Sequence, residues 1–103
     1  NVVYIELLRR FHPQYTDVFY YRDQQCEVDF LIAKEGKVQQ LIQVSYNISS
    51  EKTLKREISG LIKAAEMFKC ENLLLINFDA EQDIEKNGHT IHIVPAAEWL
   101  CNR

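Results

Sequence analysis

The chain has 103 residues, of which 47% are hydrophobic and 26% are charged, and its formal net charge is −3. This length and composition indicate a single domain over 1–103 with one packed core, and they argue against a disordered tail. The negative charge argues against a protein that binds nucleic acid over its whole surface, while a local basic patch stays open. No apolar run approaches the ~20 residues that a membrane span needs.

The cysteines and the first residue bear on the cellular context. Cys26, Cys70 and Cys101 are odd in number and far apart, which suits neither a disulfide framework nor a zinc site. Reduced thiols in a cytoplasmic protein without membrane contact are therefore expected. The chain begins at Asn1, already inside an apolar-periodic segment, so we expect a piece of a longer protein whose missing part lies upstream.

The first half of the chain predicts one helix followed by three strands. At helical spacing, one face of 2–11 carries Val3, Tyr4, Leu7, Leu8 and Phe11. Aromatic and β-branched residues indicate strands at 16–22, 26–33 and 38–46. The short polar segments between them, 23–25 and 34–37, predict turns and hence an antiparallel meander.

The second half predicts a long helix, two further strands and a short terminal helix. The long helix covers 51–69, with either Ser49 or Ser50 as its cap, and its buried stripe is Leu54, Ile58, Leu61, Ala65 and Phe68. The continuous apolar run in 72–78 predicts a central strand covered on both faces. A polar loop over 79–88 then leads to a last strand at 89–94, and Pro95 begins the terminal helix. The fold class is therefore α/β, bordering on α+β.

Two acidic positions interrupt the apolar pattern. Glu6 lies at the edge of the first helix's apolar face, where the simplest interpretation is an ion pair with Arg10 one turn later. Asp29 lies in the middle of a strand, where aspartate is disfavoured. Strict alternation places Glu27, Asp29 and Leu31 on one face and Val28, Phe30 and Ile32 on the other. That first face is either solvated or contributes two carboxylates to a divalent-metal site.

A polar pair on the next strand is the third interruption. Gln43 and Ser45 are two residues apart and share a face with Leu41, whereas Ile42, Val44 and Tyr46 point the other way. A strand this apolar keeps polar groups on one face when that face is exposed to solvent or has a function.

Taken together, these positions resemble the restriction-endonuclease-like PD-(D/E)xK fold, with a central mixed sheet. More closely, nearly the whole chain resembles the domain of unknown function found at the C-terminal end of many prokaryotic AAA-type ATPases. The matching motifs are Asn1-Val2-Val3-Tyr4-Ile5-Glu6-Leu7, Tyr20-Tyr21-Arg22, Glu27-Val28-Asp29-Phe30 and Arg56-Glu57-Ile58. The resemblance implies an ATPase module upstream in the same chain, and ATP would bind only there.

The resemblance also implies roles for individual residues. In active members of the broad fold, a helix glutamate, a strand aspartate and an acidic residue on the next strand serve a magnesium ion, and a lysine two residues later activates water. Glu6 and Asp29 match the first two positions, Gln43 stands at the second acidic position, and Ser45 stands at the lysine position. Gln43 brings no charge to a metal and Ser45 brings none to a scissile phosphate, and losing one such group costs ~10²–10³-fold in rate. Lys52, Lys55 and Arg56 are candidates for a displaced cation.

Three functions follow as alternatives. The first is a non-catalytic or degenerate nuclease-like accessory domain of an AAA-type ATPase, which binds nucleic acid or a protein partner. The second is an active magnesium-dependent nuclease with a displaced lysine, and the third is a pure protein-interaction domain. A metal site formed by His89 and His92 finds no support, because the two residues face opposite ways on one strand. A phosphate-binding loop finds none either, because the chain has three glycines and no glycine-rich segment. The adjacent Arg56 and Glu57 are expected to form a structural ion pair.

Overall fold

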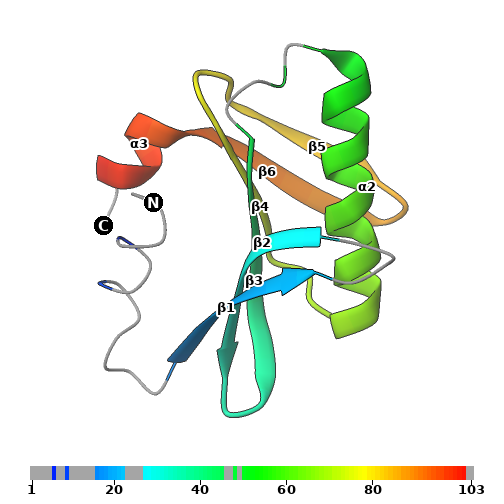
Figure 1. Ribbon diagram of the computed structural model, residues 1–103. Coiled ribbons are helices and arrows are strands. Elements are labelled where there is room, and N and C mark those ends of the chain that lie inside the picture. The colour runs from blue at the N-terminus through cyan, green and yellow to red at the C-terminus, as the bar shows by residue number, and fades with distance from the viewer. Residues whose placement is uncertain are drawn as a thin grey trace.

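The computed structural model describes residues 6, 9, 16–22, 27–45, 48 and 50–101, and the side chains of all of these except 16–22 and 27. Its core is one mixed sheet of six strands in the order β1-β2-β3-β4-β6-β5 (Figure 1). The strands are β1 Thr16–Arg22, β2 Glu27–Lys34, β3 Lys37–Val44, β4 Leu73–Asn77, β5 Gln82–Lys86 and β6 His89–Pro95. The helices are α2 Glu51–Phe68 and α3 Ala96–Cys101. The expected α/β class is confirmed.

The strand pairing separates the sheet into two halves. β1, β2 and β3 form the predicted antiparallel meander, while β3, β4 and β6 run parallel to one another. β4 lies at the centre of the parallel half, and all five of its residues are buried. This agrees with its apolar sequence, because a strand covered on both faces has no polar side to show.

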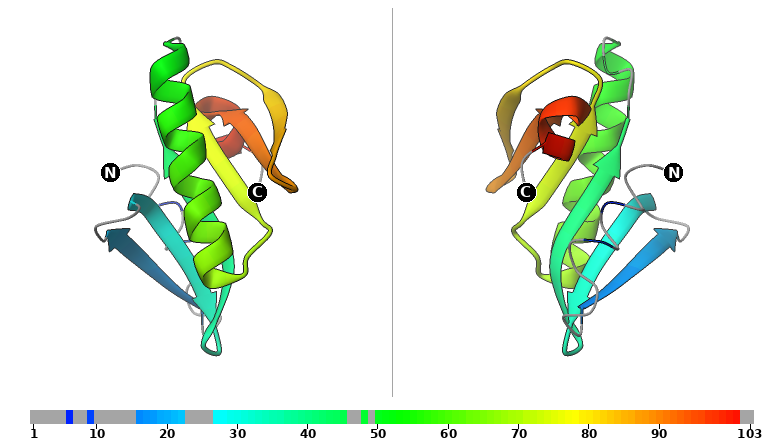
Figure 2. Two further views of the ribbon diagram at one scale, coloured as in Figure 1. Left: turned by 90° about the vertical axis from the view of Figure 1, so that its right-hand side faces the viewer. Right: turned by 90° about the vertical axis from the view of Figure 1, so that its left-hand side faces the viewer.

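The two helices lie on opposite faces of the sheet (Figure 2). α2 packs Ile58, Leu61 and Ala65 into a core that includes Leu41, Leu75 and Ile93. On the other face, Trp99 of α3 packs with Phe30, Ile42 and Ile76. Leu41 and Ile42 therefore face opposite sides, as strand alternation predicts. Among the described residues, no helix is long and apolar enough to cross a membrane.

The fifth strand corrects the expectation of a polar loop over 79–88. β5 pairs antiparallel with β6, and only Ile84 of its five residues is even partly buried. An exposed edge strand of this kind carries no hydrophobic alternation that would identify it. The signal that was missed is Asn87-Gly88, whose φ angles of 55° and 80° suit the tight turn of a two-residue hairpin.

Other boundaries shift by smaller amounts. Pro95 is the last residue of β6 rather than the first of the terminal helix, which begins at Ala96. Ser50 caps α2 and accepts a hydrogen bond from the Thr53 backbone N–H, while Ser49 lies outside the described residues. Of the first predicted helix, the structure describes Glu6 and Arg9, and both are helical. The rest of 2–11 lies outside the described residues.

The C-terminal end of α2 provides a stability prediction. Lys69 follows the helix with φ 55° and ψ 46°, and the next amide donates to the Ala65 carbonyl at 3.0 Å. A side chain in this left-handed conformation is strained, whereas glycine is not. Lys69→Gly should therefore raise the free energy of unfolding by about 0.5 kcal/mol, measured by urea denaturation. Lys63→Gly, an exposed change inside the same helix, should instead lower it by about 1 kcal/mol. A loss of stability in both variants would contradict this prediction.

Candidate functional site

Asp29 and Gln43 lie where β2 and β3 stop pairing through their backbones. The described ladder between the two strands ends at Phe30 and Ile42. Beyond it, the Asp29 backbone N–H donates to the Gln43 side-chain oxygen Oε1 at 3.0 Å. The Val44 backbone N–H donates to the Asp29 carboxylate Oδ2 at 2.9 Å. Two side chains thus replace the missing backbone bonds, and we call Asp29, Gln43 and Val44 the fork.

The other edge of β3 keeps its regular ladder at the same place. Gln43 and Val44 lie opposite Leu75 and Ile76 of β4. The Ser45 backbone N–H continues this ladder by donating to the Ile76 carbonyl at 2.8 Å. β3 is therefore paired with β4 from Leu41 to Ser45, and only its β2 side needs the fork.

A β-bulge in β2 explains how the Asp29 side chain can reach the Val44 backbone of the neighbouring strand. Phe19 and Tyr21 of β1, two residues apart, lie opposite Leu31 and Val28, which are three residues apart. The additional residue turns Val28 to the face of Leu31, where both pack in the core beneath α2. This corrects the expectation that Val28 shares a face with Phe30 and Ile32. Bulges re-aim side chains in this way because they interrupt strand alternation.

Gln43 also connects the fork to α2. Its amide nitrogen Nε2 donates to the Glu57 carboxylate oxygen Oε2. Gln43 is buried, and the Glu57 side chain is only 13% exposed. The partners fix the amide's orientation, because the Asp29 N–H needs an acceptor and the carboxylate needs a donor. A neutral amide serves both, whereas an ionised carboxylate can only accept, so glutamine fits this position better than an ionised acidic residue.

Glu57 was absent from the predicted site. Its position in the helix could have indicated that it belongs there. It lies three residues after Leu54 and four before Leu61, on the buried side of α2. A carboxylate at that spacing needs a partner. The expected ion pair with Arg56 is present, with 3.5 Å between Nη2 and Oε1, although the Arg56 side chain is 75% exposed.

The proposed displaced cations lie elsewhere on α2. Lys52 and Lys55 are exposed, and Lys55 Nζ is 3.4 Å from Glu51 Oε1. At about 100° per residue, both lysines lie more than about 130° around the helix from Glu57. They therefore face away from the fork. Arg56, the third candidate, instead contacts Glu57, the residue that accepts a hydrogen bond from Gln43.

Glu6 is buried and pairs with Arg9. The two guanidinium nitrogens Nε and Nη2 lie 3.2 Å and 2.6 Å from the two carboxylate oxygens. This bidentate contact raises the pKa of Arg9 through the hydrogen bond to Glu6. Arg9, three residues on, is thus a partner of Glu6, and the expected partner Arg10 lies outside the described residues. Residues three apart in a helix are neighbours on its surface, which allows this contact.

The side chains of Asp29 and Gln43 are poor ligands for a magnesium ion. Asp29 Oδ2 and Gln43 Oε1 already accept backbone N–H groups, and Gln43 contributes no charge. Mg²⁺ is usually held by one or two free carboxylates together with water. Among the described residues, no three His, Cys, Asp or Glu side chains are grouped so that they could hold a metal.

A second buried amide, Asn77, was missed by the sequence interpretation. It ends β4, is 1% exposed, and lies among apolar residues. Its Nδ2 donates to the carbonyls of Ala80 and Val94 at 2.8 and 3.0 Å. Its Oδ1 accepts from the N–H groups of Asp79 and Ala80 at 3.1 and 2.7 Å. Asn77 therefore fixes the chain after β4 against the end of β6.

His89 and His92 contact different carboxylates. His89 Nδ1 lies 3.1 Å from Glu71, and His92 Nδ1 lies 2.8 Å from Asp83. Their different partners agree with the prediction that they face opposite sides of β6.

The fold and site thus define a mixed α/β domain whose polar strand residues join β2, β3 and α2. The chain belongs to the family Domain of unknown function (DUF4143), which matches residues 1–99. It is also similar to Uncharacterized protein MJ1544 of Methanocaldococcus jannaschii, with 36% identity over 105 residues and 96% of this chain covered. The chain spans 23% of the length of that relative. No solved structure matches the chain.

Proposed function

We propose that this domain is a non-catalytic, nuclease-like accessory domain of a longer AAA-type ATPase chain. It acts by binding a partner rather than by cleaving a phosphodiester bond. The observation that carries this proposal is Gln43, whose amide bonds the Asp29 backbone on one side and the Glu57 carboxylate on the other. The position that would hold a metal in an active nuclease is used here to join two strands to a helix.

The order of the elements supports the nuclease-like part of the proposal. A helical residue, Glu6, precedes a three-stranded meander, a long helix and a strand parallel to the third. This is the arrangement expected from the resemblance to the PD-(D/E)xK fold. The proposal that the domain belongs to a longer ATPase chain is supported by the motifs of the chain. It is also supported by the length of the relative, of which this chain spans 23%.

The active-nuclease alternative has weaker support. Lys52 and Lys55 face away from the fork, so neither supplies the positive charge that Ser45 lacks. Arg56, the third candidate, is paired with Glu57. Without a second metal-binding carboxylate at position 43, the transition state for phosphodiester cleavage has less electrostatic stabilisation.

A cleavage assay tests the proposal. The protein, incubated with plasmid DNA or single-stranded RNA in Mg²⁺ or Mn²⁺, should cleave no faster than the buffer alone. Asp29→Asn and Lys52→Gln should give the same background result. Cleavage by the wild type that disappears in Asp29→Asn, while circular dichroism shows that variant to be folded, would refute the proposal.

A further inference from the structure

The most exposed large hydrophobic side chain lies far from the fork along the sequence. Among the described residues, only Phe78 and Met67 are exposed large hydrophobics, at 71% and 42%. Phe78 directly follows β4, and its neighbours are fixed by the four hydrogen bonds of Asn77. The aromatic ring is therefore presented to solvent from a well-anchored turn, which lowers the entropy cost of using it in a contact.

The segment that begins at Phe78 is strongly acidic. Residues 78–98 contain five carboxylate side chains and one lysine, whereas the net charge of the whole chain is −3. The carboxylates belong to Asp79, Glu81, Asp83, Glu85 and Glu98, and all of them are exposed. The negative charge of the protein is therefore concentrated around β5, the end of β6 and α3.

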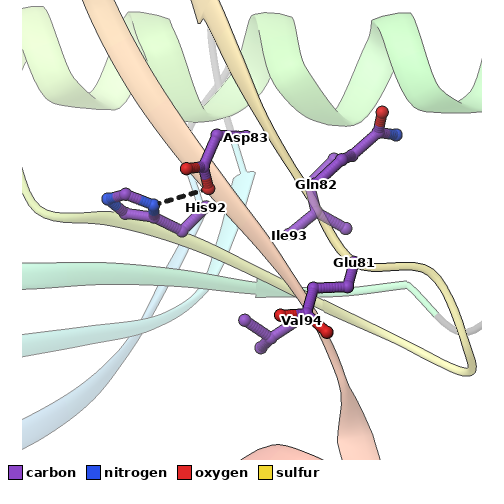
Figure 3. Close-up of a pocket in the computed structure, with 6 residues that line it drawn as sticks. All are labelled: Glu81, Gln82, Asp83, His92, Ile93 and Val94. Atoms are coloured by element: carbon purple, nitrogen blue, oxygen red, sulfur yellow. Dashed lines mark hydrogen bonds and ion pairs between the residues drawn. The ribbon is translucent and has the colours of Figure 1, made fainter.

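A shallow hollow lies within this acidic region (Figure 3). It is lined by Glu81, Gln82, Asp83, His92, Ile93 and Val94. His92 points its Nδ1 at Asp83 across the β5–β6 pair, and Glu81 lies beside Val94 at the end nearer to α3. The hollow thus offers carboxylates around a partly apolar floor.

Two of these carboxylates repel each other. The charge of Glu81 raises the pKa of Glu98, with smaller contributions from burial and from the hydrogen bond between the two side chains. Glu98 is in the first turn of α3, and Glu81 immediately precedes β5. A cation placed between them would relieve this repulsion.

We propose that Phe78, Glu81, Asp83 and Glu98 form a docking surface for a protein segment that carries arginine or lysine beside an apolar side chain. The apolar side chain covers Phe78, and the cation lies between the carboxylates. An arginine also gains from stacking on the phenylalanine ring. Charge complementarity favours this occupant over nucleic acid, because the carboxylates outnumber the basic side chains here and would repel phosphates. This inference does not depend on the nuclease-like interpretation of the fork.

A peptide titration followed by ¹H–¹⁵N NMR tests this surface. The probe is an acetylated, amidated hexapeptide of alternating leucine and arginine, and the matched peptide has citrulline in place of arginine. We expect the arginine peptide to shift the amides of 78–83, 92–94 and 98, and the citrulline peptide to bind at least about fivefold more weakly. Shifts centred on α2 or β1, or equal binding of both peptides, would overturn the proposal.

Three variants sharpen the same test. Phe78→Ala should weaken binding about tenfold, as expected for an interface aromatic, and it should stay folded because Phe78 is exposed. Glu98→Gln should weaken binding about threefold, whereas Glu66→Gln, an exposed change on α2, should leave it unchanged. If Glu66→Gln weakens binding as much as Glu98→Gln, the attraction is a general effect of charge and the proposal fails. Displacement of the peptide by a single-stranded oligonucleotide that shifts these same amides would also overturn it.

Discussion

Replacing Asn77 by alanine should lower the free energy of unfolding by about 3 kcal/mol. The change leaves the carbonyls of Ala80 and Val94 and the N–H groups of Asp79 and Ala80 without the partners they now have. Asn77 is 1% exposed, so water does not replace its amide without rearrangement of the turn. Urea denaturation followed by circular dichroism measures the loss.

Two further variants separate hydrogen bonding from shape. Asn77→Asp keeps the size of the side chain but cannot donate to Ala80 and Val94 when ionised, so at neutral pH it should destabilise as much as alanine. Asn72→Ala removes an exposed amide whose oxygen lies 3.4 Å from Gln40 Nε2, and it should change stability by less than about 0.5 kcal/mol. Equal stabilities of Asn77→Asp and the wild type would show that the two donated hydrogen bonds contribute nothing.

Replacing Gln43 by glutamate should destabilise the protein by about 2–3 kcal/mol at pH 7. The introduced carboxylate keeps the acceptor for the Asp29 N–H but faces the Glu57 carboxylate instead of donating to it. This repulsion raises the pKa of the new group above its value in the unfolded chain. The loss is therefore full at neutral pH and shrinks as the pH falls toward about 4, where a protonated acid donates again.

The comparison variants for Gln43 differ in their dependence on pH. Gln43→Met removes both hydrogen bonds without adding charge, so its loss of stability should change less between pH 7 and pH 4.5 than the loss in Gln43→Glu. Gln39→Glu adds a carboxylate to an exposed position of the same strand and should have little effect. A pH-independent loss in Gln43→Glu would show that the new carboxylate does not face Glu57.

The strands and helices with strong apolar patterns could be predicted from the sequence. The meander, α2 and the buried strand β4 follow from periodicity and turn residues, because burial imposes these patterns. β5 could not be found in that way, since an exposed edge strand has no face to bury. Asn87-Gly88 was its only local signal.

Two of the predicted site residues lie together, but their connections could not be predicted. Asp29 and Gln43 do lie together, as neighbouring strands require. The bulge that turns Asp29 toward Val44 depends on pairing between β1 and β2, and no single strand encodes it. The role of Glu57 depends on how α2 crosses the sheet, which is a property of the packed structure.

The central claim is that the Asp29–Gln43 pair joins structural elements and does not hold a metal. Titration with Mn²⁺ tests this most directly, because the ion broadens the ¹H–¹⁵N signals of nearby amides. In the wild type at submillimolar Mn²⁺, the amides of Asp29, Phe30, Val44 and Ser45 should keep their intensity relative to the rest of the described chain. Selective broadening of these four amides, removed by Asp29→Asn, would contradict the account.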